Sequence, residues 1–131
     1  WLAKPSLREL GELTGQALDS PAAQREAAQD LVARGRAHAI ALSLGGQGAL
    51  LCTPEGSWTS PALPVPVLST IGAGDSFLAG LLWAHDRGVG WIEALRTAMA
   101  AGAAALGAPG TALSQPGEVE RLRPQVSVQP A

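Results

Sequence analysis

Two glycines and an aspartate that open a helical pattern are the strongest candidates for chemistry in this chain. They lie in Gly72-Ala73-Gly74-Asp75. Glycine lets the backbone bend sharply, and the first amides of a helix lack internal partners and attract anions such as phosphate. A carboxylate in the same turn can take a proton from an attacking hydroxyl, and phosphoryl transfer depends mostly on positioning and charge stabilisation. Taken alone, however, these residues suit a plain glycine turn with Asp75 as a helix cap even better.

The elements around this turn predict an α/β fold. Residues 38–44 form a nearly continuous apolar run, typical of a strand buried on both faces. The turn Gly45-Gly46-Gln47-Gly48 joins it to a second strand over 49–53. Helices and strands alternate along the chain, which favours a mostly parallel sheet.

The remaining expected elements follow from caps, periodicity and proline positions. Ser6 with Glu9 has the spacing of a capping box, and Gly15 ends that first helix. Ser20 and Pro21 suit the start of the next helix, which Gly35 ends. The other expected segments are strand end 1–4, proline-rich edge strands and connections over 54–68, a helix after residue 72, a helix over 91–107, a connection and short helix over 110–122, and a final strand over 124–130.

Composition narrows the functional classes. The chain has 131 residues, 47% apolar and 15% charged, which is enough for one folded domain. Its net charge of -2, without charged blocks, argues against a nucleic-acid partner. One cysteine, Cys52, excludes an internal disulfide and is expected to serve packing. The uncharged stretch 97–117 is too weakly apolar for a membrane span, so a cytoplasmic setting is expected. Because the chain starts at Trp1, we expect a piece of a longer protein.

The fuller string identifies a family. Gly72 to Phe77, followed by Ala79-Gly80, resembles the C-terminal signature of the ribokinase/phosphofructokinase-B (pfkB) sugar kinases. The resemblance implies a ribokinase-like three-layer sandwich, with residues 1–131 as the C-terminal nucleotide-binding and catalytic portion. It also implies ATP-dependent phosphorylation of a sugar, with Asp75 as the base and Gly72, Ala73 and Gly74 as an anion hole.

Other stretches resemble the same family. Lys4 to Leu10 is similar to its Lys-Pro-Asn-x-x-Glu-Leu segment, which implies that Glu9 organises Mg²⁺; a solvated capping role is equally compatible with the spacing. Residues 43–49 resemble the loop that borders the nucleotide phosphates, and the helix over 97–106 resembles the one beside the adenine. The tail over 110–128 resembles the ends of 1-phosphofructokinases and tagatose-6-phosphate kinases, which implies a ketohexose phosphate as acceptor. The nucleotide-binding residues implied are Ser43, Gly45, Gly48 and Gly74, although a strand end and a tight turn would also explain the first three.

Three departures from the family pattern modify these expectations. Ser6 stands where the family usually has asparagine, and Ser69 where it usually has aspartate. Since serine removes a negative charge, activation by a monovalent cation such as potassium is expected to be weak or absent. The N-terminal half and its lid are missing from this chain, so we expect it to be inactive alone and to depend on that half, or on a homodimer. Ser6 and Ser69 also motivate the alternative of a non-catalytic nucleotide-binding or interaction module. Lys4 could reach phosphate, but an exposed side chain is the simpler expectation.

Overall fold

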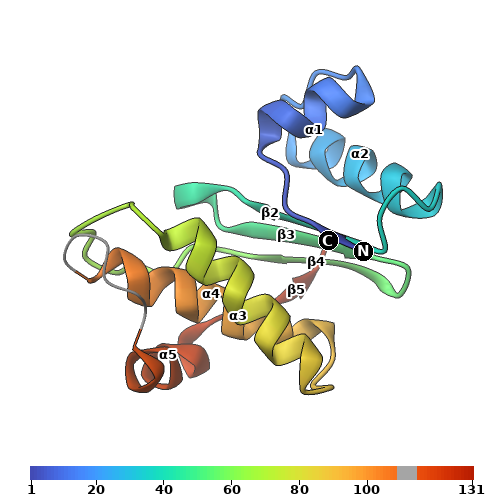
Figure 1. Cartoon of the computed structure of the whole chain (residues 1–131). Helices are drawn as coiled ribbons and strands as arrows, with labels where there is room; N and C mark the ends of the chain where they lie inside the picture. Colours follow the sequence, from blue (N-terminus) through green and yellow to red (C-terminus); the bar gives the residue numbers. More distant parts are fainter. Residues whose placement is uncertain (109–114) are drawn as a thin grey trace. The chain divides into compact units, whose positions relative to one another are not determined.

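The computed structural model describes residues 1–108 and 115–131 and divides the chain into two compact units. Unit 1 comprises Trp1–Gly45, Ala49–Thr59 and Gln129–Ala131. Unit 2 comprises Gly46–Gly48 and Ser60–Val128. Figure 1 follows the chain through these segments.

The sheet has the strand order β1-β2-β3-β4-β5, with strands at Leu2–Ala3, Ala39–Ser43, Ala49–Thr53, Gly56–Ser60 and Gln129–Pro130. β1 pairs with β2 in parallel, whereas the pairs β2–β3 and β4–β5 are antiparallel. The α/β class is confirmed, but the sheet of this chain is mixed rather than mostly parallel. Residues 44–48, which join β2 to β3, are too few for the crossover that a parallel pair requires.

Helices α1 (Leu7–Thr14) and α2 (Pro21–Ala33) belong to unit 1 and lie on the same side of its sheet (Figure 1). Ile40 and Leu42 of β2 are two positions apart and therefore face the same side. With Leu10 of α1, they contribute to one apolar cluster. The other buried members of this cluster are Ala27, Ala28, Leu50 and Cys52.

Both helices of unit 1 begin as expected. The Ser6 hydroxyl accepts the Glu9 amide at 3.2 Å, and Glu9 Oε2 accepts the Ser6 amide at 2.8 Å, which completes a capping box. Gly15 ends α1 in the left-handed conformation, with φ of 66°. The Ser20 hydroxyl accepts the Ala23 amide at 3.1 Å and caps α2. The caps confirm these sequence-based boundaries.

Replacing Ser6 with alanine is expected to lower the free energy of unfolding by about 1 kcal/mol, because the Glu9 amide loses its acceptor. Ser6→Asn is the matched control, since asparagine caps a helix about as well as serine. Urea denaturation of the full-length protein measures both changes. An equal loss in the asparagine variant would show that the cap is not the cause.

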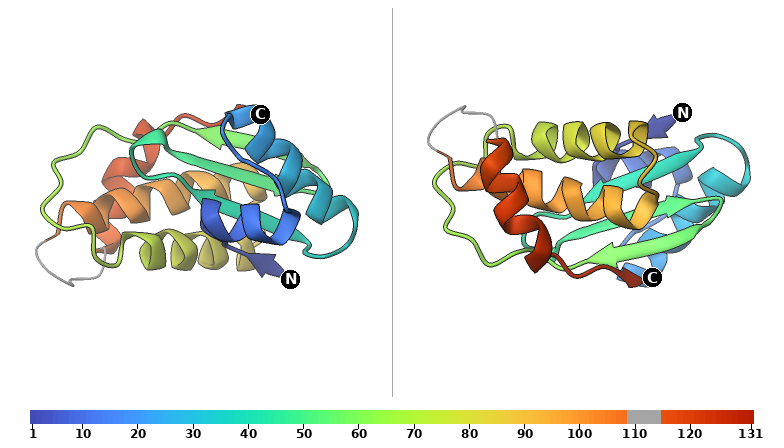
Figure 2. Two further views of the ribbon diagram at one scale, coloured as in Figure 1. Left: turned by 90° about the horizontal axis from the view of Figure 1, so that it is seen from above. Right: turned by 90° about the horizontal axis from the view of Figure 1, so that it is seen from below.

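Unit 2 is built on α3 (Ala73–Asp86), α4 (Trp91–Leu106) and α5 (Pro116–Leu122). Figure 2 shows α3 and α4 side by side, with α5 lying across α4. Gly80 permits the close approach, because a Cβ atom there would lie 2.9 Å from Ala101 Cβ and 3.2 Å from Ala98 Cα. The small side chains of these helices therefore serve packing.

The expected final strand over 124–130 is much shorter than its pattern suggested. Residues Arg123–Gln125 form a short 3₁₀ turn, and only Gln129–Pro130 pair with β4. Val126 is buried at 2% exposure, and its carbonyl accepts a hydrogen bond from the Arg96 guanidinium. Val126 therefore anchors unit 2 instead of extending the strand. Residues 110–114 of the tail over 110–128 lie outside the described residues.

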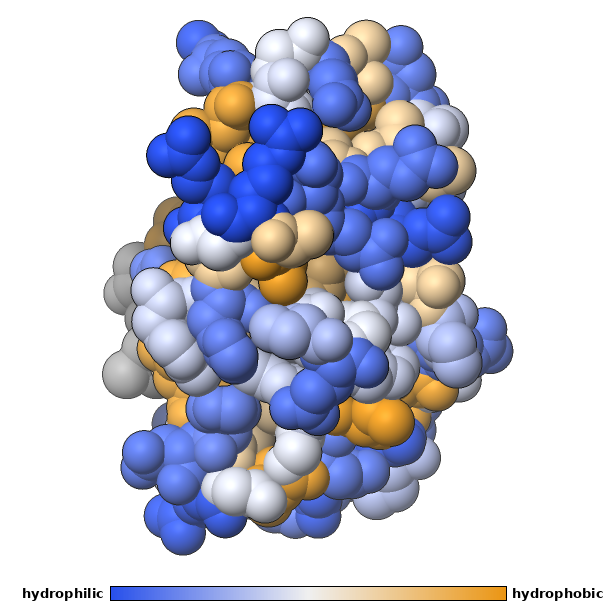
Figure 3. Space-filling model, turned by 90° about the vertical axis from the view of Figure 1, so that its right-hand side faces the viewer, coloured by the Kyte–Doolittle hydropathy of each residue, from blue (hydrophilic) through white to orange (hydrophobic). Residues whose placement is uncertain are grey.

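The face of the molecule in Figure 3 is mostly hydrophilic, and apolar residues reach it only in small separate groups. Across residues 1–108 and 115–131, no helix has the length and apolar character needed to span a bilayer.

Candidate active site

The glycine turn before α3 leaves backbone amides open. Gly72 is the N-cap residue with φ of 82°, a backbone conformation that is unfavourable for residues other than glycine. The first helical hydrogen bond runs from the Ser76 amide to the Gly72 carbonyl at 2.9 Å. Within the described residues, the amides of Ala73, Gly74 and Asp75 donate to no acceptor. Three free amides thus stand at the positive end of a helix, which is an arrangement suited to an anion.

Asp75 lies in the first turn of α3, and its side chain is exposed. Its carboxylate makes no ion pair or hydrogen bond with residues 1–108 or 115–131. The next two residues, Ser76 and Phe77, are buried and anchor the turn. Gly102 of α4 faces this turn, since a Cβ atom there would make an ordinary contact with Phe77 Cβ at 3.6 Å. The arrangement can offer an exposed base beside an anion.

Lys4 and Ser43 lie together within unit 1. Because β1 and β2 are parallel, their carboxyl ends meet at one edge of the sheet. Lys4 follows β1, Ser43 ends β2, and Lys4 Nζ lies 3.5 Å from Ser43 Oγ. The half-buried Lys4 is paired with no carboxylate among the described residues. The sequence predicts Lys4 as a simple exposed side chain, whereas in the structure it is half-buried beside Ser43. The signal available in the sequence was that residues just after parallel strands share one end of the sheet.

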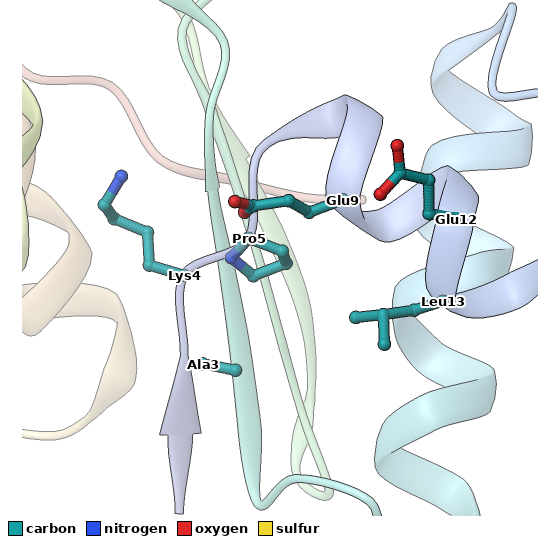
Figure 4. Close-up of a pocket in the computed structure, with 6 residues that line it drawn as sticks. All are labelled: Ala3, Lys4, Pro5, Glu9, Glu12 and Leu13. Carbon is teal, nitrogen blue, oxygen red and sulfur yellow. The ribbon is translucent and has the colours of Figure 1, made fainter.

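Glu9 lies in a pocket of about 520 Å³ in unit 1, which Lys4 and Glu12 also line (Figure 4). In that view the Glu9 carboxylate points back toward the Lys4–Pro5 segment. Its Oε2 belongs to the capping box, so the structural role of Glu9 is visible directly. Glu12 accepts a hydrogen bond from Arg8 at 2.8 Å, an exposed pair.

Glu9 fits one mode of Mg²⁺ binding and not another. The described residues contain no group of three or more His, Cys, Asp or Glu side chains that could hold a metal by themselves. Mg²⁺ is, however, commonly bound by one or two carboxylates together with substrate phosphates and water. A carboxylate has more acceptor positions than the single capping bond uses. The residues therefore suit a Mg²⁺ that arrives with phosphate groups.

Gly45 and Gly48, which lie in the loop between β2 and β3, are needed for different structural reasons. Gly45 begins a 3₁₀ turn (Gly45–Gln47) with φ of 56°, and a Cβ atom there would meet open space. Gly48 has φ of 93°, and a Cβ atom there would lie 1.9 Å from the Ser60 carbonyl oxygen and 2.9 Å from Pro61 Cα. The fold of unit 2 therefore requires glycine at position 48, independently of any ligand that this loop contacts.

Ser69 takes part in a local turn. Its hydroxyl accepts the Ile71 amide at 3.2 Å. The segment 61–71 contains no aspartate or glutamate, so it offers a cation no carboxylate. Three large apolar side chains of this segment are exposed, namely Val67, Leu68 and Ile71.

Comparisons with known proteins identify the family of this chain. Residues 1–117 match the pfkB family of carbohydrate kinases. The ATP-dependent 6-phosphofructokinase isozyme 2 of Mycobacterium tuberculosis is 42% identical over 122 residues, which are 93% of this chain and 36% of that protein. The 1-phosphofructokinase of Haloferax volcanii is 39% identical over 111 residues, 85% of this chain and 36% of that protein.

A solved structure of a phosphofructokinase also matches this chain. The crystal structure of phosphofructokinase-2 from Escherichia coli in complex with potassium matches with a TM-score of 0.89 at 34% identity. The match covers 95% of this chain and 40% of that chain. The chain therefore spans well under half the length of each of these three proteins.

Proposed function

Because the chain belongs to the pfkB family of carbohydrate kinases and has part of the ribokinase-like fold, we propose that its protein transfers the γ-phosphoryl group of ATP to a sugar phosphate hydroxyl. One observation carries the proposal: three free amides and an exposed carboxylate share the first turn of α3. Residues 1–131 are then the nucleotide-binding and catalytic portion of the kinase. The shared turn also favours catalysis over a module that only binds nucleotide.

Each residue of the turn has a chemical role in this proposal. The acceptor hydroxyl gives its proton to the Asp75 carboxylate while its oxygen attacks the γ-phosphorus. The bond from that phosphorus to the ADP oxygen breaks, and ADP leaves. The amides of Ala73 and Gly74 stabilise the negative charge of the transferred group, and Gly72 provides the bend that exposes them.

Nucleotide binding is proposed for residues that follow the family resemblance. Ser43, Gly45, Gly48 and Gly74 are proposed to border the phosphates. Lys4 joins them, since its ammonium lies beside the Ser43 hydroxyl and meets no carboxylate of the described residues. Glu9 would hold Mg²⁺ through the carboxylate acceptor positions that are not used by its capping hydrogen bond. When bound, Mg²⁺ neutralises phosphate charge.

A panel of acceptors tests the activity. The full-length protein is expected to release ADP from ATP with fructose 6-phosphate, fructose 1-phosphate or tagatose 6-phosphate, since a ketohexose phosphate is the proposed substrate. Residues 1–131 alone are expected to be inactive, because the chain covers only 36% of the M. tuberculosis relative. The rest of the sugar site would come from other parts of the protein or from a second copy. Magnesium-independent nucleotide binding without turnover of any acceptor would instead support the non-catalytic module.

Potassium is expected to have little effect on this protein. The E. coli relative was crystallised with potassium, but here segment 61–71 has no carboxylate and the Ser69 hydroxyl is used in its own turn. Exchanging potassium for tetramethylammonium should leave both turnover and the melting temperature unchanged. The variant Ser69→Asp should gain a potassium-dependent rise in melting temperature. Steep potassium dependence of the unaltered protein would contradict the prediction.

A further inference from the structure

A second concave site lies within unit 2, where α3, α4 and α5 meet. It has a volume of about 330 Å³, at the small end of ligand sites. Ala79 and Gly80 of α3 and Ala101 of α4 line it, and Gly80 and Ala101 lie where the two helices touch. Trp83 and Val119 supply apolar walls. None of these residues belongs to the proposed phosphoryl-transfer site.

Two hydroxyl groups in this pocket have no hydrogen-bond partner in the part of the chain that the structure describes. Ser76 and Thr97 line it and are each only 6% exposed, yet neither side chain forms a hydrogen bond with residues 1–108 or 115–131. A helical threonine commonly donates to the carbonyl one turn earlier. Thr14 of α1 does so, bonding to the Leu10 carbonyl at 2.8 Å. Neither hydroxyl oxygen is sealed in the interior, so both open into the pocket, where a ligand group can complete their hydrogen bonds.

The charge of the lining restricts the ligand. Glu120 is the charged residue in the lining, so an anion is disfavoured. Its carboxylate meets Arg123 only at 3.5 Å and retains free acceptor positions. The Trp83 indole can contact a planar ring, while Arg87 lies 4.1 Å from the centroid of its ring system. A hydroxyl pair can both donate to and accept from an amide-like group.

We propose that this pocket binds a small aromatic molecule that carries a neutral amide or a cationic amidine group. The ring would lie against Trp83 and the small residues, and the polar group would bond to Ser76 and Thr97. Since Ser76 directly follows Asp75, an occupant would contact the helix that carries the proposed base. The site would therefore be suited to an effector.

Three probes of nearly equal shape test the proposal on the full-length protein: benzamide, benzamidine and benzoate. Binding is followed by NMR through the indole N–H signal of Trp83, which Trp83→Phe assigns. Benzamide and benzamidine are expected to bind with a Kd of order 1 mM, as suits a ligand of this size. Benzoate, which is anionic, should bind at least about tenfold more weakly because of Glu120.

Variants locate the binding. Ala79→Leu fills the pocket from an exposed position of α3 and should abolish binding, whereas Ala22→Leu, at an exposed position of α2, should not. Thr97→Val should weaken benzamide binding about fivefold, the size of one hydrogen bond, without lowering the melting temperature. Absence of binding by all three probes, equal binding of benzoate, or unchanged binding in Ala79→Leu would each overturn the proposal. The readout uses no turnover, so this result is independent of the kinase assay.

Discussion

Replacing Asp75 with asparagine is expected to lower turnover of the full-length protein by about 10²–10⁴-fold, which is the usual contribution of a general base. Asparagine keeps the size of the side chain in the first turn of α3 but cannot accept the proton of the acceptor hydroxyl. Affinity for ATP should be unchanged, because Asp75 is exposed and the neighbouring amides remain. ADP release measures turnover, and calorimetric titration measures affinity.

Asp86→Asn is the matched control for this result. Asp86 is also exposed but lies at the other end of the same helix, so the same chemical change there should leave turnover intact. Near-normal turnover of the Asp75 variant would remove Asp75 from the mechanism. An equal loss in turnover and ATP affinity would assign Asp75 to binding instead.

Gly48→Ala should have the largest effect on stability, lowering the free energy of unfolding by at least about 3 kcal/mol. A methyl group at this position would lie 1.9 Å from the Ser60 carbonyl oxygen, and Ser60 is completely buried. The backbone of Gly48 is also in the left-handed region. Both the collision and the conformation oppose a side chain, and chemical denaturation measures their sum.

Gly45→Ala separates the two causes. Gly45 shares the left-handed conformation, but a methyl group there would meet open space. The free energy of unfolding of Gly45→Ala should fall by only about 1 kcal/mol, which is the cost of the backbone conformation alone. Equal losses in the two variants would show that the contact with Ser60 is unimportant.

Local signals in the sequence predicted the elements of unit 1 and α3 well. Ser6 and Ser20 placed the starts of two helices, because a cap depends on residues only three positions apart. Gly72 marked the start of α3 for the same reason, since a left-handed residue is a local requirement. The pfkB family and its ribokinase-like fold were also predicted correctly from one short string.

Features that depend on distant contacts were predicted less well. The alternation around Val126 suggested a strand, but the Val126 carbonyl instead accepts a hydrogen bond from Arg96, thirty residues away. The antiparallel pairing of β2 with β3 follows from the short loop around Gly45–Gly48, a local signal that the prediction of a mostly parallel sheet did not use. Lys4 and Ser43 meet across 39 positions, so no local spacing indicates their contact.

The reactivity of the buried Cys52 thiol in unit 1 can be used to measure local opening of the folded protein. Cys52 is the single cysteine of the chain and is fully buried, and that burial raises its pKa above the usual value. Since the thiolate is the reactive form, alkylation in the folded state is blocked both by access and by protonation. The rate of alkylation of Cys52 therefore reports how often the apolar cluster around it opens. A nucleotide that binds only the folded state should slow that labelling.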